Sequence, residues 1–140
     1  MEHRIIFATG NAGKMKEVRM ILGDLGVPVL SMKEAGIAAD IVENGKSFEE
    51  NAVIKAEAIR DLTAAGDLVL ADDSGLEIDY LDGAPGIYSA RFMGEDTSYV
   101  IKNTALVEKL AGVPEEKRTA RFVCAIACAL PDGRPITTRG

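Results

Sequence analysis

The sequence predicts an α/β fold, and three observations carry this prediction. A short apolar strand near the start of the chain is followed by a Gly-containing turn and a helical pattern. A second helical pattern precedes the apolar run Leu68–Ala71, which is typical of a buried strand. The longest apolar strand candidate, Thr119–Leu130, predicts a further strand with a hairpin partner. The 140 residues are enough for one domain with its own core.

Composition limits the function classes. Hydrophobic residues make up 47% and charged residues 27%, as in ordinary globular proteins. The sequence has no apolar run of the ~18 residues that a membrane span needs, and its start does not resemble a signal peptide. We therefore expect a cytoplasmic protein with no membrane partner. The net charge of -6 argues against nucleic acid as a partner, but it is compatible with a local basic pocket for a small polyanion.

Two cysteines, Cys124 and Cys128, lie in the apolar run FVCAIACAL. No histidine or further cysteine stands near them at metal-ligand spacing. We expect reduced core residues rather than zinc ligands or a disulfide.

The first predicted strand, Arg4–Ala8, runs into the loop Thr9–Lys14 and a helix that ends near Leu22. A strand, a Gly-rich turn and a helix together offer backbone N–H groups to a phosphate. The side chains of Thr9 and Asn11 could add donors, and the lysine that ends the loop could reach a bound anion. The alternative is a plain Asn-capped helix after a tight turn. The predicted apolar face of this helix consists of Met15, Val18, Ile21, Leu22 and Leu25.

The next segment is predicted to hold short strands and a long helix. The expected elements are a strand at Val27–Leu30, an irregular connection at Ser31–Asp40, a strand end with a turn at Ile41–Gly45 and a helix from Ser47 to about Ala65. Ser47 and Glu50 form a predicted capping box, so the presence of Glu50 has a structural explanation. Glu43 has no such explanation.

The long helix has two stripes with different chemistry. Its predicted buried stripe consists of Phe48, Ala52, Ala56 and Ile59. Asn51 and Lys55 lie four residues apart on a neighbouring stripe. The alternative for Lys55 is an ordinary solvated surface lysine.

Two adjacent carboxylates, Asp72 and Asp73, follow the strand Leu68–Ala71 and precede Ser74 and Gly75. Successive side chains of an extended segment point to opposite faces, so the two cannot enter the same core. A carboxylate at the end of a buried strand commonly holds a hard cation or acts as a base. The alternative is a solvated Asp-Asp-Ser-Gly turn.

The rest of the chain is predicted to continue as strand, loop, helix and hairpin. The expected elements are a half-exposed antiparallel strand at Leu76–Leu81, a loop at Asp82–Gly86 continued by Ile87–Phe92, a helix from Asp96 or Thr97 to Leu110, and a turn at Pro131–Gly133 that leads Thr119–Leu130 into Arg134–Arg139.

Four blocks combine these signals: TGNAGK, ENGKSFEENAVIKA, LADDSG and GAPGIYSARF. In this order and spacing they closely resemble the inosine triphosphate pyrophosphatase family, which hydrolyses dITP, ITP and XTP to the monophosphate and pyrophosphate. The resemblance implies a mixed α/β fold with a long bent central sheet flanked by helices and two lobes around a nucleotide cleft. It also implies a magnesium requirement, a homodimer, and residues 1–140 as a single pyrophosphatase domain.

The resemblance also implies a role for each matching residue. Thr9, Gly10, Asn11, Ala12, Gly13 and Lys14 would bind the triphosphate together with Lys55, and Ser74 would contact substrate. Glu43 and Asp73 would be magnesium ligands, and Asp73 would also be the general base that activates water. Asp72 and Asn51 would support them, and Arg91 would be an extra anion contact. A triphosphate brings about four negative charges, so such a site needs lysines, backbone donors and Mg²⁺.

Family members continue with a Gly-rich segment that ends in Phe-Gly-Tyr-Asp-Pro and later with Ser-His-Arg, which shape the purine pocket. Neither stands in this sequence, so the resemblance implies a C-terminally truncated member. One alternative is therefore a nucleotide-binding fragment with weak or no catalysis. A regulatory receiver-type domain would also carry an Asp-Asp pair and a lysine in an α/β sheet. Its acidic pair would follow the first strand, where this chain has a loop of the phosphate-binding type.

Overall fold

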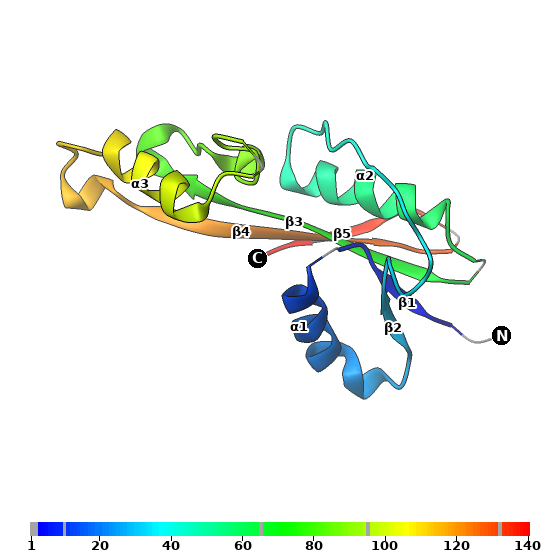
Figure 1. Ribbon diagram of the computed structural model, residues 1–140. Coiled ribbons are helices and arrows are strands. Elements are labelled where there is room, and N and C mark those ends of the chain that lie inside the picture. The colour runs from blue at the N-terminus through cyan, green and yellow to red at the C-terminus, as the bar shows by residue number, and fades with distance from the viewer. Residues whose placement is uncertain (1–2, 10, 65, 95, 132) are drawn as a thin grey trace. The chain divides into compact units, whose positions relative to one another are not determined.

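The computed structural model describes residues 3–9, 11–64, 66–94, 96–131 and 133–140. In these residues five strands form one sheet in the order β2-β1-β3-β4-β5, with three α-helices (Figure 1). The strands are β1 (Ile5–Phe7), β2 (Val29–Ser31), β3 (Leu68–Ile78), β4 (Ala120–Ala129) and β5 (Ile136–Arg139), and the helices are α1 (Ala12–Leu22), α2 (Phe48–Arg60) and α3 (Tyr99–Lys109). Because β1 is parallel to β2 and β3 while β4 and β5 are antiparallel, the sheet is mixed and the predicted α/β class is confirmed.

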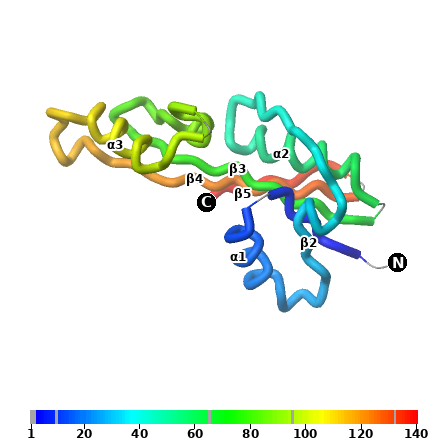
Figure 2. Tube along the Cα trace, viewed as in Figure 1, coloured from blue at the N-terminus to red at the C-terminus, as the bar shows by residue number. Residues whose placement is uncertain are grey.

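The chain divides into two compact units. The first consists of Met1–Asp73 and Ala125–Gly140, and the second of Ser74–Cys124. In the first unit α1 and α2 cover opposite faces of the sheet, and β5 runs beside β4 (Figure 1, Figure 2). None of the helices in the described ranges has both the length and the apolar character of a membrane span.

The core of the first unit lies between α2 and the sheet. Its fully buried members are Ile6, Ala8, Ala52, Ala56, Ile59, Val69, Ala71, Ala127 and Ala129. The predicted buried stripe of α2 is confirmed, since Phe48 is buried as well. Small alanines on α2 and β4 let the helix lie close to the sheet.

The ends of α2 differ in detail from the prediction. Ser47 Oγ accepts a hydrogen bond from the Glu50 N–H at 3.0 Å, as a capping box requires. The Glu50 carboxylate accepts from the Lys46 N–H at 2.6 Å rather than from Ser47, so only half of the box forms. The helix ends at Arg60 rather than near Ala65 as predicted. At this end the Thr63 hydroxyl donates a hydrogen bond to the Arg60 carbonyl at 2.9 Å.

Helix α1 begins two residues earlier than predicted, because Asn11 caps it. Only Met15 of the predicted apolar face is fully buried, with Val18 and Leu22 half-buried. Ile21 is 76% exposed and Leu25, which follows the helix, is 60% exposed, so that part of the prediction is wrong. The helix packs through the narrow stripe at positions 15, 18 and 22, and Ile21 lies outside it.

Strand β3 is longer than predicted. It runs without interruption from Leu68 to Ile78, so Ser74 and Gly75 form no turn and Leu76–Leu81 is not a separate antiparallel strand. Strand β4 lies beside it in the sheet, and ladder pairing with a long neighbour outweighs the local turn preference of Ser-Gly. The strand end predicted at Ile41–Gly45 is also wrong, since this segment has no regular structure.

In the second unit the residue that caps α3 is Ser98, not Asp96 or Thr97 as predicted. The Thr97 hydroxyl donates a hydrogen bond to the Met93 carbonyl instead. The helix contributes one buried lysine, Lys102, which donates to the Ala90 carbonyl at 2.8 Å.

The predicted hairpin from β4 to β5 is confirmed, although Asp132 in its turn lies outside the described residues. Both cysteines of β4 are free thiols. They are half-buried rather than in the core, and burial raises the pKa of Cys128.

Candidate functional site

The site residues meet where the pairing of β1 with β3 ends. The register places Phe7 opposite Leu70, and the Ala8 N–H donates to the Leu70 carbonyl at 2.8 Å. Asp72 and Asp73 follow on β3, just beyond this last pairing. Ligands of α/β sheets bind outside the carboxyl ends of parallel strands, and this is such a position.

The two aspartates point to opposite faces of the sheet, as the sequence predicts. The Asp72 carboxylate meets Lys14 of α1, with 2.7 Å between Oδ2 and Nζ. The Asp73 carboxylate accepts a hydrogen bond of 3.2 Å from Asn51 Nδ2 of α2. The alternation of a regular strand thus gives each carboxylate a polar partner from a different helix.

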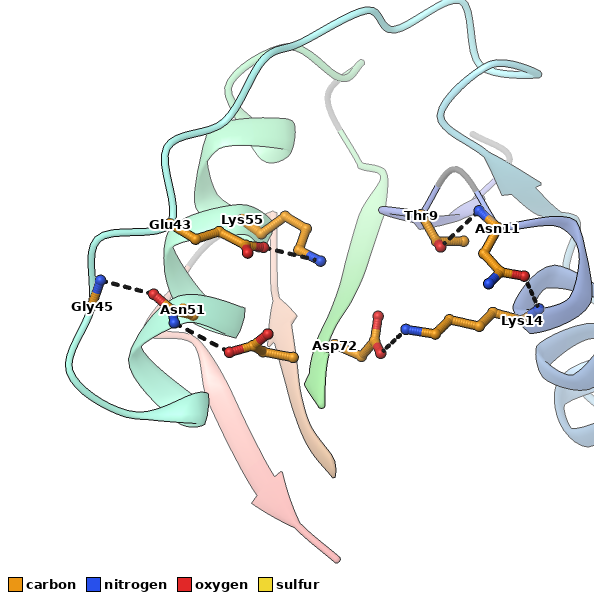
Figure 3. A network of polar contacts seen from close by, with 9 residues as sticks. Thr9, Asn11, Lys14, Glu43, Gly45, Asn51, Lys55 and Asp72 are labelled. Carbon is orange, nitrogen blue, oxygen red and sulfur yellow. Dashed lines mark hydrogen bonds and ion pairs between the residues drawn. The ribbon is translucent and has the colours of Figure 1, made fainter. Parts of the chain in front are cut away.

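Lys55 lies one helical turn after Asn51 on α2. Its Nζ is 3.2 Å from Glu43 Oε1, and both side chains are largely buried (Figure 3). The alternative of a plain surface lysine is therefore wrong: the side chain is only 20% exposed.

Asn51 connects the Glu43 segment with Asp73. It is almost completely buried, and its Oδ1 accepts from the Gly45 N–H at 2.8 Å (Figure 3). Its Nδ2 donates to Asp73. A Cβ at position 45 would lie 2.7 Å from Asn51 Oδ1 and 2.8 Å from Glu50 Cβ, so only glycine fits. The sequence pattern did not identify Gly45; its signal is a glycine just ahead of the helix cap.

The Thr9–Lys14 loop is built around the start of α1. The Thr9 hydroxyl oxygen accepts from the Asn11 N–H at 3.1 Å, and Asn11 Oδ1 accepts from the Lys14 N–H at 3.1 Å (Figure 3). Locally this is the predicted Asn-capped helix. The first N–H groups of a helix have no partner within it, so the same geometry suits an anion beside Ala12 and Gly13. Gly10 lies outside the described residues.

The electrostatic surroundings make Asp73 a stronger base than a solvated aspartate. Burial raises its pKa, and the nearby carboxylates of Glu43 and Asp72 raise it further. The hydrogen bond from Asn51 and the charge of Lys55 lower the pKa, but the net direction is upward.

Two predicted site residues belong to the second unit. Ser74 is exposed on β3 directly after Asp73. Arg91 follows a short 3-10 turn, and its guanidinium carbon lies 5.9 Å from the centre of the Tyr88 ring.

The carboxylates of the site have the chemistry that magnesium prefers. Glu43, Asp72 and Asp73 offer hard oxygen ligands. Burial is the main reason that the pKa of Asp73 is raised, and the charges of Glu43 and Asp72 raise it further, so a nearby cation would favour the charged form of Asp73. Within residues 3–9, 11–64, 66–94, 96–131 and 133–140, no three acidic, histidine or cysteine side chains are already gathered for a metal ion. Glu43 and Asp72 each hold a lysine instead. The oxygen donors of this set match the ligand chemistry that magnesium prefers.

Comparison with known proteins identifies the family. The model of the Ham1 family matches residues 5–140, nearly the whole sequence. The chain belongs to the Ham1 family. This confirms the resemblance to the inosine triphosphate pyrophosphatases and leaves no basis for the receiver-type alternative.

Curated relatives and solved structures agree with this assignment. The chain is 51% identical over 137 residues to a dITP/XTP pyrophosphatase of Exiguobacterium sibiricum, covering 98% of this chain and 68% of that protein. It is 46% identical to a dITP/XTP pyrophosphatase of Clostridium perfringens, with coverages of 98% and 69%. The Staphylococcus aureus Ham1 protein superposes with a TM-score of 0.86 at 38% identity, covering 98% of this chain and 68% of that one. The chain thus spans about two thirds of the length of these relatives.

Proposed function

We propose that this protein hydrolyses non-canonical purine nucleoside triphosphates, namely dITP, ITP and XTP, to the nucleoside monophosphate and pyrophosphate. The observation that carries the proposal is the 51% identity, across 98% of the chain, to a protein named dITP/XTP pyrophosphatase. The site supports it, because Lys14 pairs with Asp72 near the start of α1, Lys55 of α2 pairs with Glu43, and Asp73 follows Asp72 on β3.

The positive side of the site binds the triphosphate. Lys14 and Lys55 come from α1 and α2, and each has a flexible stem that lets its ammonium turn toward a phosphate. The first amides of α1 add donors that need no rearrangement. Thr9 and Asn11 position these amides through their hydrogen bonds.

The carboxylates of the site would hold magnesium. Glu43 and Asp73 are the proposed ligands, with Asp72 and Asn51 in support. Bound magnesium supplies positive charge that offsets the charge of the phosphates. Asn51 fixes the orientation of the Asp73 carboxylate, because its amide is itself held by the Gly45 N–H.

Asp73 is the proposed general base. It accepts a proton from the water whose oxygen attacks the α-phosphorus. A bond forms between that oxygen and the α-phosphorus, and the bond to the bridging oxygen breaks, so that pyrophosphate leaves. A carboxylate with a raised pKa accepts the proton more readily than an ordinary aspartate.

Other expected properties of the protein stay predictions. These are the substrate contacts of Ser74 and Arg91, the homodimer, the cytoplasmic location, the lack of nucleic-acid and membrane partners, and residues 1–140 as a single domain.

Incubation with dITP or dATP and Mg²⁺, followed by a pyrophosphate assay, tests the proposal. Pyrophosphate release from dITP is the expected result. Binding of dITP without any release would leave a silent nucleotide-binding protein, and the absence of both would contradict the proposed function.

A further inference from the structure

Both lysines proposed to bind phosphate are held by carboxylates in this structure. Lys14 Nζ lies 2.7 Å from Asp72 Oδ2, and Lys55 Nζ lies 3.2 Å from Glu43 Oε1 (Figure 3). The two pairs come from opposite faces of the sheet, so they are independent examples of one arrangement. The positive charges that a triphosphate needs are already neutralised inside the protein.

We infer that Asp72 and Glu43 act as internal counter-ions, which make the site select the cation-bound form of a polyphosphate over the free anion. The inference rests on the proposed function of the site and goes beyond it. It assigns these carboxylates a role in excluding metal-free nucleotides and phosphates, in addition to any role toward the metal.

The charges of the site explain the selection. The site contains three carboxylates, those of Glu43, Asp72 and Asp73, but only the two ammonium groups of the lysines. A polyphosphate without a cation would have to pair with both lysines, and this would leave the negative charges of the carboxylates without a positive partner. The Asp72 side chain is only 5% exposed, and an unpaired carboxylate in such a place is costly. A polyphosphate that arrives with a cation brings a replacement partner for these carboxylates.

The exposed fractions of the two side chains indicate whether Lys14 or Asp72 moves when a phosphate binds. The Lys14 side chain is 43% exposed, whereas that of Asp72 is fixed in a buried strand. A lysine ammonium on its four-carbon stem can turn from the carboxylate to a phosphate without a change in the backbone. The exchange therefore needs no movement of β3.

The exchange has a thermodynamic consequence. If magnesium makes the lysines available and phosphate makes the carboxylates available, each ligand raises the affinity for the other by the same factor. Removing one counter-ion charge should strengthen binding of the free anion and weaken this coupling.

Titration calorimetry with inorganic pyrophosphate tests the inference without any catalysis. The parent is titrated in excess EDTA and in Mg²⁺, and the same is done for Asp72→Asn. In EDTA we expect Asp72→Asn to bind pyrophosphate about tenfold more tightly than the parent, a change expected for removing one nearby charge. We also expect the gain in affinity from Mg²⁺ to be smaller in the variant than in the parent.

Asp79→Asn is the matched control. Asp79 pairs with Arg121 at 2.8 Å on the surface of the second unit, so this variant makes the same chemical change and the same change in net charge. Its affinity for pyrophosphate should stay within about twofold of the parent, because the charge of an exposed, paired carboxylate is screened by solvent and salt.

The possible results separate the inference from the function. If the parent binds no pyrophosphate even with Mg²⁺, the proposed function fails and the inference fails with it. If the parent binds but Asp72→Asn gains nothing in EDTA, or gains no more than Asp79→Asn, the inference alone is overturned. Should Asp72→Asn not fold, Glu43→Gln tests the second pair through the titration in EDTA, where a gain in pyrophosphate affinity is again expected. The Glu43 side chain is 26% exposed, so this change removes a charge from a less buried place.

Discussion

Asp73 is the residue on which the chemistry of the site depends. Asn51 donates to its Oδ2, and an asparagine at position 73 could still accept this hydrogen bond through its amide oxygen. The change Asp73→Asn therefore keeps the shape and removes the base. We expect turnover to fall by on the order of 100-fold or more with a modest change in substrate affinity. Steady-state kinetics measure this, with Asp79→Asn as the control. Equal turnover in Asp73→Asn and the parent would remove Asp73 from the mechanism.

Glu43 has a different proposed role from Asp73. Its carboxylate is a proposed magnesium ligand, whereas in the competing view Glu43 is a loop residue that merely pairs with Lys55. Glu43→Gln should raise the magnesium concentration needed for half-maximal activity, because an amide oxygen is a weaker ligand than a carboxylate. A magnesium titration of activity at saturating dITP checks this. An unchanged magnesium concentration at half-maximal activity would mean that Glu43 only pairs with Lys55 and does not bind the metal.

At the scale of elements, the segment before α2 is held by one glycine. A Cβ on Gly45 would lie 2.7 Å from Asn51 Oδ1, on a side chain that is fixed at both ends. We expect Gly45→Ala to lower the free energy of unfolding by about 1–3 kcal/mol, as overpacking does. It should also lower turnover by displacing the Glu43 segment.

Gly23→Ala provides the control for this prediction. Gly23 has φ of -59°, and no atom lies within 4 Å of its added Cβ. Alanine there should be neutral or slightly stabilising. Urea unfolding of both variants makes the comparison. Equal stability of the two would mean that Gly45 is replaceable.

Local patterns predict the faces of these elements better than their ends. The period of two places Asp72 and Asp73 on opposite faces, and helical spacing identifies the buried stripe of α2, because both follow from backbone geometry. The continuation of β3 through Ser74 and Gly75 could not be predicted in this way. It depends on pairing with β4, which lies some fifty residues later in the chain.

The polar contacts of the site are harder still to predict. The family blocks bring Lys14, Lys55, Glu43 and both aspartates together, but they do not say which lysine meets which carboxylate. Pairing across α1, α2 and β3 is a tertiary property. The same holds for Gly45, whose requirement appears only when Asn51 is in place.

At the scale of the whole molecule, the pair Arg4–Asp67 links the start of β1 to the start of β3. Asp67 is buried, and its Oδ2 lies 2.7 Å from an Arg4 guanidinium nitrogen. The hydrogen bond and charge of Arg4 lower the pKa of Asp67 below its ordinary value. A carboxyl with a lowered folded-state pKa stabilises the protein above its unfolded pKa of about 4, and this stabilisation is lost as the pH falls through the folded-state value.

Asp67→Asn should therefore cost about 1–3 kcal/mol of stability at pH 7, since it leaves Arg4 without its charged partner. The difference from the parent should shrink below pH 4. Urea unfolding at pH 7 and at several acidic values measures both effects. The exposed pair Asp79–Arg121 is the comparison, and Asp79→Asn should cost much less at pH 7. A pH-independent difference for Asp67→Asn would contradict the linkage.

In the proposed reaction, water attacks the α-phosphorus of a purine nucleoside triphosphate. Hydrolysis of dITP with Mg²⁺ in ¹⁸O-labelled water, with mass analysis of both products, tests this attack. We expect one ¹⁸O atom in the monophosphate and unlabelled pyrophosphate, because the new bond joins the water oxygen to the α-phosphorus. Label in pyrophosphate, or release of inorganic phosphate together with the nucleoside diphosphate, would contradict it.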